Sequence, residues 1–562
     1  MTSQGKTSYK AFMPDIHRVC LIDTNPLIAA AFEEAGCEVL RISTGQTRFF
    51  NLPPVLEENG FVPDMLVQTE TLANRSLVVG LDTLDCPTLF WAMDPHLNAY
   101  WHSAYANLFD VTCSTQRKLL PRLREQGAED VRWLPMCGRE RGWKDMADRA
   151  HDITFVGRVS AHRPARKWMI ELLRSHGEQY DVALEHSLTY GDMLNLYEDS
   201  RLVPNESIFG EVNFRLFEGA SCGCLVLSQN LGDEQEALFE PGREFDTYSD
   251  VVELDDKLRR YLKNPRLMQT MGRAARERVL ADHLPKNRAQ SMLEFAADAS
   301  RRRATGPDAE KWLALTAAAM WESGLLPIPM GELLERLKKL EQGPEVAAAL
   351  LQVQTRAGMD KVMKDNLTTI LAADYYADSP VLNMAGSMAS LAVEHWDGAK
   401  AFWYRHLKTL SGRDPQPPTE PWQLLTLWAK DLKRRDQIIR AGFPYDPNAH
   451  LPKVATDCLM LILKDMPEHL PTLRLLDTML RPVVGLEQAR VGYLSILTLH
   501  ERNDWRLAFE IALANLKSYR LKSGMEELHV AREIARQQGQ EAMFAKALAA
   551  RDESGLLAAR LG

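Results

Sequence analysis

Short apolar runs alternate with helix-length amphipathic segments along the first part of the chain. The runs with strand character are Val19–Ile22, Glu38–Ile42, Asp64–Gln68, Pro87–Ala92, Val111–Cys113 and Val131–Leu134. Alternation of strand and helix is typical of a parallel sheet covered by helices. We therefore predict an α/β domain with a Rossmann-like sheet over residues 1–140.

A second series of the same kind follows a polar, charged segment at Arg139–His151, which we expect to be an interdomain linker. Its strand-like runs are Asp152–Val156, Asp181–Leu184, Arg201–Pro204 and Cys224–Leu227. This series predicts a second Rossmann-like domain over residues 141–304. Because doubly wound sheets bind ligands at the carboxyl ends of their strands, we expect a ligand cleft between the two domains.

From about Asp250 the pattern becomes helical, and the basic, Gly- and Pro-containing run Ser300–Pro307 is a plausible boundary. We predict an α-helical domain over residues 305–562. Two segments in it share a Trp-x-x-Ala opening, Trp396–Ala399 and Trp505–Ala508. Stacked helix pairs of the tetratricopeptide type and a plain helical bundle both fit this pattern, and the stacked form would offer a concave surface to a partner.

Composition narrows the class of protein. The chain has 562 residues, 45% of them hydrophobic and 25% charged, with a net charge of −9, which argues against nucleic acid or an anionic membrane as a partner. No apolar run approaches the ~20 residues that cross a bilayer, and no signal peptide is evident. The eight cysteines lie mostly in apolar segments, as in a cytoplasmic protein with reduced thiols.

A glycine and several arginines follow the end of one predicted strand. Gly157 and Arg158 come directly after Val156, with Arg163 at the start of the next helix. Backbone N–H groups and guanidinium groups in such a loop can bind a diphosphate, and a glycine lets the backbone approach it closely. A solvated basic helix start is the alternative, although positive charge there is electrostatically disfavoured.

A single acid, Glu218, lies among apolar and small residues in a predicted helix over Phe214–Ser221. A buried charge needs a partner, which here is a ligand diol such as a ribose, a backbone amide or an arginine. Asn213 and Arg215 stand at the start of the same helix, where they could assist an anion, or Asn213 could simply cap the helix.

The segment from Asp152 to about His283 resembles the nucleotide-sugar-binding domain of group 1 glycosyltransferases of the GT-B fold, and most closely the branch of spore-maturation glycosyltransferases. The resemblance lies in Gly157-Arg158 with a basic residue five positions later, in the Val-Asn-x-Arg-x-Phe-Glu-x-x-x-Cys-Gly pattern over 212–223, and in Glu-x-x-x-Leu-Phe-x-Pro-Gly-x-Glu over 234–244. It implies that Glu218 binds the ribose of a nucleotide sugar and that Arg158 and Arg163 bind its diphosphate.

The same resemblance leaves the stereochemistry of transfer open. Retaining members of the wider superfamily often carry two glutamates separated by seven residues, whereas Glu211 and Glu218 have six between them. If the reaction inverts, a base is needed to deprotonate the acceptor hydroxyl.

Three residues of the first domain are candidates for that base. Trp91–His96 resembles the aspartate-rich loop of the family. Asp94 and His96 lie just beyond a predicted strand end, so they would face the cleft, and His102 lies one or two turns further on. A helix cap is the alternative role for Asp94, and packing among aromatic neighbours is the alternative for His102.

The chain contains no Asp-x-Asp, so we predict neither a metal site nor a cofactor other than the nucleotide-sugar donor. The sequence thus predicts a cytoplasmic glycosyltransferase that moves a sugar to an acceptor hydroxyl on a protein, for example a flagellin-like surface protein bound by the helical region. The alternatives are an enzyme that builds a cell-surface polysaccharide or lipopolysaccharide, and a helical scaffold that carries an idle transferase domain.

Overall fold

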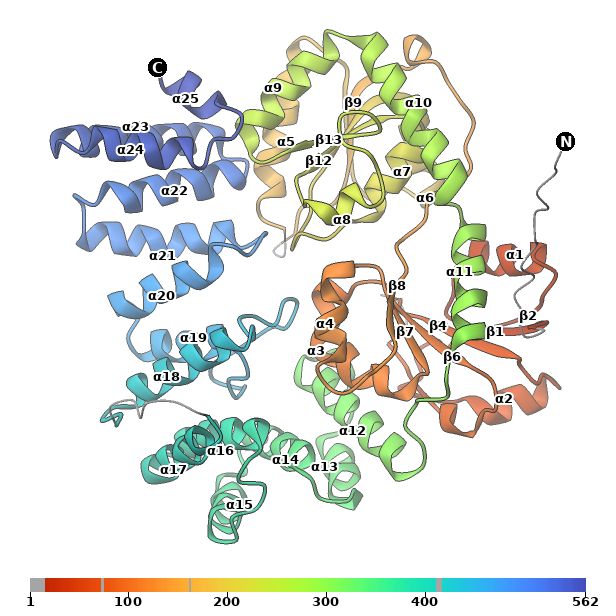
Figure 1. Ribbon diagram of the computed structural model, residues 1–562, viewed down its shortest axis with the longest axis vertical. Helices are drawn as coiled ribbons and strands as arrows, with labels where there is room; N and C mark the ends of the chain where they lie inside the picture. The colour runs from red at the N-terminus through yellow and green to blue at the C-terminus, as the bar shows by residue number, and fades with distance from the viewer. Residues whose placement is uncertain (1–15, 72–74, 161–162, 411–416) are drawn as a thin grey trace, which may run out of the picture. The chain divides into compact units, whose positions relative to one another are not determined.

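The computed structural model describes residues 16–71, 75–160, 163–410 and 417–562, and the chain divides into two compact units. The first unit comprises the described residues up to 135 together with 285–389 and 441–445, and the second comprises 136–284, 390–440 and 446–562 (Figure 1). Each unit combines one large parallel sheet with part of the expected helical segment 305–562. The units therefore cut across that segment, because some of its helices pack on each α/β half.

The first unit contains a six-stranded parallel sheet in the order β2-β1-β4-β6-β7-β8. Its strands are β1 (Arg18–Ile22), β2 (Glu38–Ile42), β4 (Met65–Thr69), β6 (Thr88–Ala92), β7 (Val111–Ser114) and β8 (Val131–Trp133). All six predicted strands are present. A small pair of strands, β3 (Phe49–Asn51) and β5 (Leu77–Val79), was not predicted, because three residues are too few to show a periodicity. The helices are α1 (Pro26–Glu34), α2 (Leu52–Glu58), α3 (Pro95–Tyr105), α4 (Leu120–Arg124) and α11 (Pro285–Asp298).

The second unit contains a five-stranded parallel sheet in the order β10-β9-β11-β12-β13. Its strands are β9 (His151–Val156), β10 (Val182–Glu185), β11 (Ser200–Asn205), β12 (Leu225–Gln229) and β13 (Asp246–Tyr248). The four predicted strands are confirmed, and β13 is added at the edge. The helices are α5 (Arg166–Ser175), α6 (Tyr190–Glu198), α7 (Phe214–Ser221), α8 (Asp233–Glu236), α9 (Val251–Leu262) and α10 (Pro265–Asp282).

The remaining described elements are helices, as the periodicity predicted. They are α12 (Pro307–Glu322), α13 (Met330–Lys339), α14 (Pro344–Arg356), α15 (Asp360–Ala372), α16 (Pro380–Ala392), α17 (Trp396–Lys408), α18 (Pro421–Arg434), α19 (Ala455–Asp465), α20 (Leu470–Leu480), α21 (Glu487–His500), α22 (Trp505–Lys517), α23 (Leu521–Gln537), α24 (Glu541–Ala549) and α25 (Leu556–Leu561). From α17 to α24 each helix packs against the next. In the part of the chain that the structure describes, none of the helices is long and apolar enough to cross a membrane. The predicted fold class, two Rossmann-like domains followed by helices, is confirmed.

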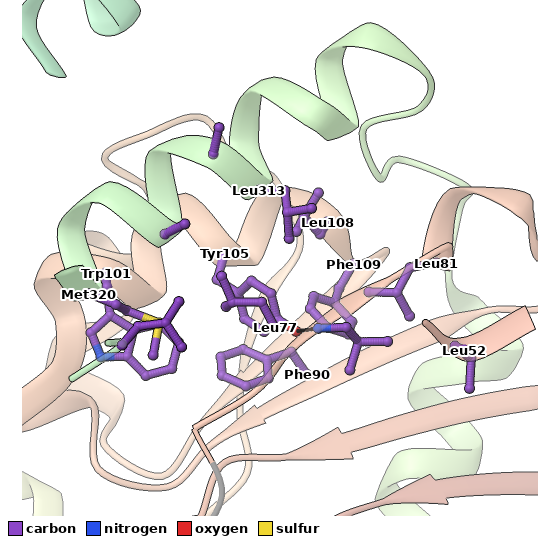
Figure 2. Close-up of a cluster of buried hydrophobic side chains, with 14 of the residues drawn as sticks. Leu52, Leu77, Leu81, Phe90, Trp101, Tyr105, Leu108, Phe109, Leu313 and Met320 are labelled. Carbon is purple, nitrogen blue, oxygen red and sulfur yellow. Dashed lines mark hydrogen bonds between the residues drawn. The ribbon is translucent and has the colours of Figure 1, made fainter. Parts of the chain in front are cut away.

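The helix α12 completes the core of the first unit. Leu313 and Met320 of this helix pack with Trp101, Tyr105 and Leu108, as Figure 2 shows. The Tyr105 hydroxyl donates to Gln68 Oε1 at 2.7 Å and accepts from the backbone N–H of Val78 at 3.0 Å, so this buried hydroxyl is satisfied as donor and as acceptor.

The last helices complete the core of the second unit in the same way. Phe509 and Leu516 of α22 and Leu557 of α25 join one cluster with Leu254 and Leu258 of α9. Helices from both ends of the expected helical segment are therefore part of the α/β cores, and their removal would expose core side chains to water.

The polar segment Arg139–His151, expected to be a linker, packs within the second unit. Arg149 is buried, and its guanidinium donates to the carbonyl oxygens of Lys144, Ser200 and Cys222. A buried arginine whose hydrogen bonds go to backbone carbonyls fixes the chain around it, so this segment is part of the second α/β half.

Candidate functional site

The order of the second sheet reverses between β9 and β11, which lie side by side although β10 follows β9 along the chain. In open parallel sheets the crevice at such a reversal, at the carboxyl ends of the strands, is where ligands bind. Gly157 and Arg158 follow the end of β9, and Glu206 follows the end of β11. The predicted basic loop therefore lies at the position that the topology favours.

A buried ion pair fixes this edge of the sheet. Arg166, at the start of α5, donates from Nε and Nη2 to Glu206 Oε2 at 2.9 and 2.5 Å, and both side chains are buried. Its third nitrogen, Nη1, donates to the backbone carbonyl of Arg158 at 2.9 Å. Arg166 thus holds the backbone of Arg158, a candidate site residue, in place.

The guanidinium groups of Arg158 and Arg163 remain available to a ligand. Arg158 is exposed and Arg163 is half-buried. Neither side chain forms a hydrogen bond or ion pair with any residue that the structure describes. Gly157 lies tightly against its surroundings: a Cβ atom there would lie 3.0 Å from Arg166 Nη1 and 3.1 Å from the Phe155 ring, so a larger residue would disturb the loop. Two cations close in sequence after the end of β9 suit the binding of a diphosphate.

Asn213 and Arg215, the other two candidates in this loop region, are both engaged within the protein. Asn213 caps α7, because its side-chain oxygen accepts from the backbone N–H of Arg215 at 3.2 Å and its Nδ2 donates to the Glu206 carbonyl. Arg215 donates to Asn205 Oδ1 and to the Val156 carbonyl, each at 3.0 Å. It therefore joins the carboxyl ends of β9 and β11, and the capping role left open by the sequence is the one observed for Asn213.

Glu218 lies on α7 and is 7% exposed. Burial raises the pKa of this carboxyl group to about 7, and the nearby charges of Arg215 and Arg139 and a hydrogen bond with Tyr190 oppose the increase. The Arg139 guanidinium stacks over the Tyr190 ring at 4.0 Å, and Tyr190 itself is 39% exposed. The acid therefore has polar neighbours and an electrostatic environment typical of functional sites.

Glu211, whose role the sequence left in doubt, holds the loop ahead of α7. Its carboxylate accepts from the Ser207 hydroxyl and from the backbone N–H groups of Ile208 and Phe209, at 2.8 to 2.9 Å. Because these donors saturate the carboxylate inside the protein, Glu211 shapes the loop.

At the carboxyl edge of the first sheet, Glu70 follows the end of β4. It is buried and accepts from the backbone N–H groups of Met93 and Asp94 at 2.8 Å each and from Asn98 Nδ2 at 2.6 Å, while His102 Nε2 lies 3.2 Å away. Burial acts to raise the pKa of Glu70, but the charge of His102 and these hydrogen bonds outweigh it and lower the pKa. Glu70 is thus a carboxylate held by hydrogen bonds next to the start of α3.

The three predicted base candidates fall into different environments. Asp94 is half-buried at the start of α3 and forms no side-chain hydrogen bond that caps the helix, so the capping alternative for Asp94 is not what the structure shows. His96 is buried, and its Nδ1 has no hydrogen-bond partner among the described residues. His102 is fully buried between Phe90 and Trp101, at ring distances of 5.3 and 4.1 Å. This placement supports the packing role for His102. Asp94 and His96, at the carboxyl edge of the first sheet, stay the candidates for the base.

Sequence reasoning missed Glu70 and Glu206, which anchor the two edges, and Tyr190 and Arg139, which surround Glu218. A usable signal existed for the first two, because each acid comes directly after a strand of five or six residues with an apolar centre. No local signal marks Tyr190 or Arg139, since their contact with each other spans about fifty residues of sequence. Among the residues that the structure describes, no three His, Cys, Asp or Glu side chains are placed to hold a metal ion.

Residues 147–294 match the family model described as Glycosyl transferase-like. No curated protein matches the sequence of this chain. Solved structures that align with the chain include Anabaena Alr3699/HepE in complex with UDP (13% identity, TM-score 0.36, 50% of this chain and 100% of that one) and a glycosyltransferase from Rickettsia africae ESF-5 (12%, 0.34, 51% and 99%).

TarM also aligns, at 11% identity and a TM-score of 0.33 over 43% of this chain, and the match spans only 57% of TarM. The family match covers the whole of the second sheet, from β9 to β13, and ends within α11. The segment that carries Gly157, Arg158 and Glu218 is therefore similar to the glycosyl transferase-like family.

Proposed function

We propose that this protein is a nucleotide-sugar-dependent glycosyltransferase. The observation that carries the proposal is the reversal point of the second sheet, where Arg158 and Arg163 present cations within the segment similar to the glycosyl transferase-like family. The diphosphate of the donor would bind these two guanidinium groups, and the ribose hydroxyls would bind Glu218. Because two arginines can offset the charge of the leaving diphosphate, we propose that no metal ion is needed.

We propose that the acceptor hydroxyl binds at the carboxyl edge of the first sheet. If the reaction inverts, Asp94 or His96 would take its proton. Glu70 supports this role, since it fixes the backbone of Met93 and Asp94 just ahead of α3. His102 contacts Glu70, so it would influence the proton transfer only through that residue.

The acceptor class follows from the helices. Stacked helices such as α17–α24 suit a polypeptide, so we propose a protein acceptor, for example a flagellin-like surface protein, modified in the cytoplasm. A growing cell-surface glycan is the alternative acceptor, and a helical scaffold with an idle transferase domain is the third possibility.

Deletion of the helices would not separate these proposals, because α12 and α22 belong to the cores. Parallel assays of the full chain with unglycosylated flagellin and with lipopolysaccharide fragments would separate these proposals.

Calorimetric titration of the full chain with UDP, GDP and CDP tests the donor proposal. We expect one of the three to bind, and we expect the same affinity with and without EDTA. Glu218→Ala should weaken that binding about tenfold to a hundredfold, since hydrogen bonds to a charged group contribute about 1.5–3 kcal/mol. Glu171→Ala, which removes an exposed acid from α5, is the matched control and should change nothing. If none of the three nucleotides binds, the transferase proposal fails and the scaffold is favoured.

Donor binding should also depend on pH through Glu218. Its pKa is raised to about 7, so the carboxyl group is mostly protonated below that pH and ionised above it. Because two ribose hydroxyls donate best to the ionised form, affinity should rise roughly tenfold between pH 6 and pH 8. Titrations with UDP-glucose and GDP-mannose, whose diphosphates do not titrate in this range, measure the effect. Glu218→Gln should bind weakly with a flat profile, and an unchanged slope in that variant would exclude Glu218 as the titrating group.

A further inference from the structure

A tyrosine at the end of α22 adopts a conformation that is rare for its residue type. Tyr519 has φ +65°, in the left-handed region that costs a side-chain-bearing residue about 1–2 kcal/mol. It is 4% exposed, and its hydroxyl lies 2.8 Å from the hydroxyl of Tyr248, which ends β13. The strained backbone conformation of Tyr519 thus coincides with the placement of its hydroxyl against the second sheet.

The direction of the hydrogen bonds can be assigned. The Tyr248 hydroxyl donates its single proton to the backbone carbonyl of Asn205 at 2.8 Å, so the hydroxyl of Tyr519 must be the donor to Tyr248. Asn205 is the last residue of β11, and its Oδ1 accepts from Arg215 Nη1. A chain of hydrogen bonds therefore runs from the helices to the arginine that joins the ends of β9 and β11.

A second contact reaches the loop ahead of α7. Gly485, between α20 and α21, has φ +91°, and a Cβ atom there would overlap the carbonyl oxygen of Ile208. The loop around Ile208 is the one that Glu211 holds by hydrogen bonds. Only glycine combines this backbone conformation with so close an approach. The loop between α20 and α21 and the loop ahead of α7 are thus in contact backbone to backbone.

We propose that Tyr519 and Gly485 are positioning residues for donor binding, and that α20–α22 therefore set the geometry of the edge that binds the nucleotide. The inference rests on the proposed function, because it assigns these helices a role at the same donor site. Neither residue touches the ligand. Tyr519 acts through Tyr248 and Asn205 on the ends of β9 and β11, and Gly485 acts through the loop at Ile208.

Tyr519→Phe is the first test, since it removes the hydroxyl and keeps the buried ring. Titration of the full chain with UDP, GDP and CDP should show binding about threefold to tenfold weaker than in the unmodified protein, the equivalent of one hydrogen bond. The midpoint of thermal unfolding should stay close to that of the control Tyr493→Phe, whose hydroxyl forms a weak hydrogen bond with Met460 Sδ at 3.4 Å and no other with the described residues. That control should leave nucleotide affinity unchanged.

Gly485→Ala is the second test, and Gly539→Ala is its control. Gly539 also has a positive φ in a turn between helices, but a Cβ atom there meets nothing within 4 Å, so the control reproduces the backbone strain without the contact. Only Gly485→Ala should weaken nucleotide binding. If it also unfolds the protein, Tyr519→Phe still decides the question.

Combining Tyr519→Phe with Tyr248→Phe separates a relay from independent effects. If the two hydroxyls act in series, the double variant should bind no more weakly than Tyr248→Phe alone. Full affinity in Tyr519→Phe, with Glu218→Ala still impaired, would overturn the inference and leave the proposed function intact. Failure of the unmodified protein to bind any of the three nucleotides would overturn both.

Discussion

Arg303→Met should lower the free energy of unfolding of the first unit by about 3–5 kcal/mol, the usual cost of breaking a buried ion pair from one side. Arg303 follows α11, and its side chain and that of its partner Asp110 are almost completely buried. The guanidinium also donates to the carbonyls of Leu84 and Cys86. Methionine fills much of the same volume, but it leaves the Asp110 charge without a cation and two carbonyls without a donor.

Urea unfolding followed by tryptophan fluorescence measures this effect. Arg301→Met is the matched control two positions away, because the Arg301–Asp85 pair is exposed and such pairs contribute at most about 1 kcal/mol. Adding Asp110→Asn to Arg303→Met should recover part of the loss, since it removes the stranded charge. Equal losses in the Arg301 and Arg303 variants would show that burial of the pair is not the cause.

Arg166→Met should destabilise the second unit by a similar amount, about 3–5 kcal/mol, and should also weaken nucleotide binding. The stability is lost because Glu206 keeps a buried carboxylate with no cation to pair with it. Binding is lost because the Arg158 carbonyl no longer has the donor that fixes the loop after β9. Arg166 would thus combine a large effect on folding with an indirect effect on the donor site.

The two effects can be measured separately in one variant. Denaturant unfolding reports the first, and calorimetry at a temperature where the variant is still folded reports the second. Lys167→Met removes the exposed charge next to Arg166 on the same helix and should leave both quantities nearly unchanged. Unimpaired nucleotide binding by a folded Arg166→Met variant would mean that the loop at Arg158 needs no such support.

Helices of the segment 305–562 contribute side chains to the hydrophobic cores of both units. Trp505 and Phe509 of α22 pack in one cluster with residues of α9, and Leu313 of α12 packs in another with Trp101 of α3. The helical segments are therefore structural parts of the α/β halves.

Much of the fold was predictable because its signals are local. The strand Glu38–Ile42 and the helix Phe214–Ser221 lie where the sequence predicted them, since apolar periodicity and the cap at Asn213 act within a few residues. The same holds for the basic loop after Val156, which depends only on where a strand ends. Its role in binding a donor stays a prediction.

The sequence by itself determined most of the strands, their alternation with helices in two parallel sheets and the place of the basic loop, because each follows from residues that are near one another in the chain. Only the tertiary structure decided that Glu206 pairs with Arg166, that Glu70 lies beneath Asp94 and that Tyr519 reaches Tyr248. The last pair is separated by 271 positions in sequence. No local periodicity encodes such contacts: they depend on which faces of the helices and sheets are buried together, and burial is a property of the whole packed chain.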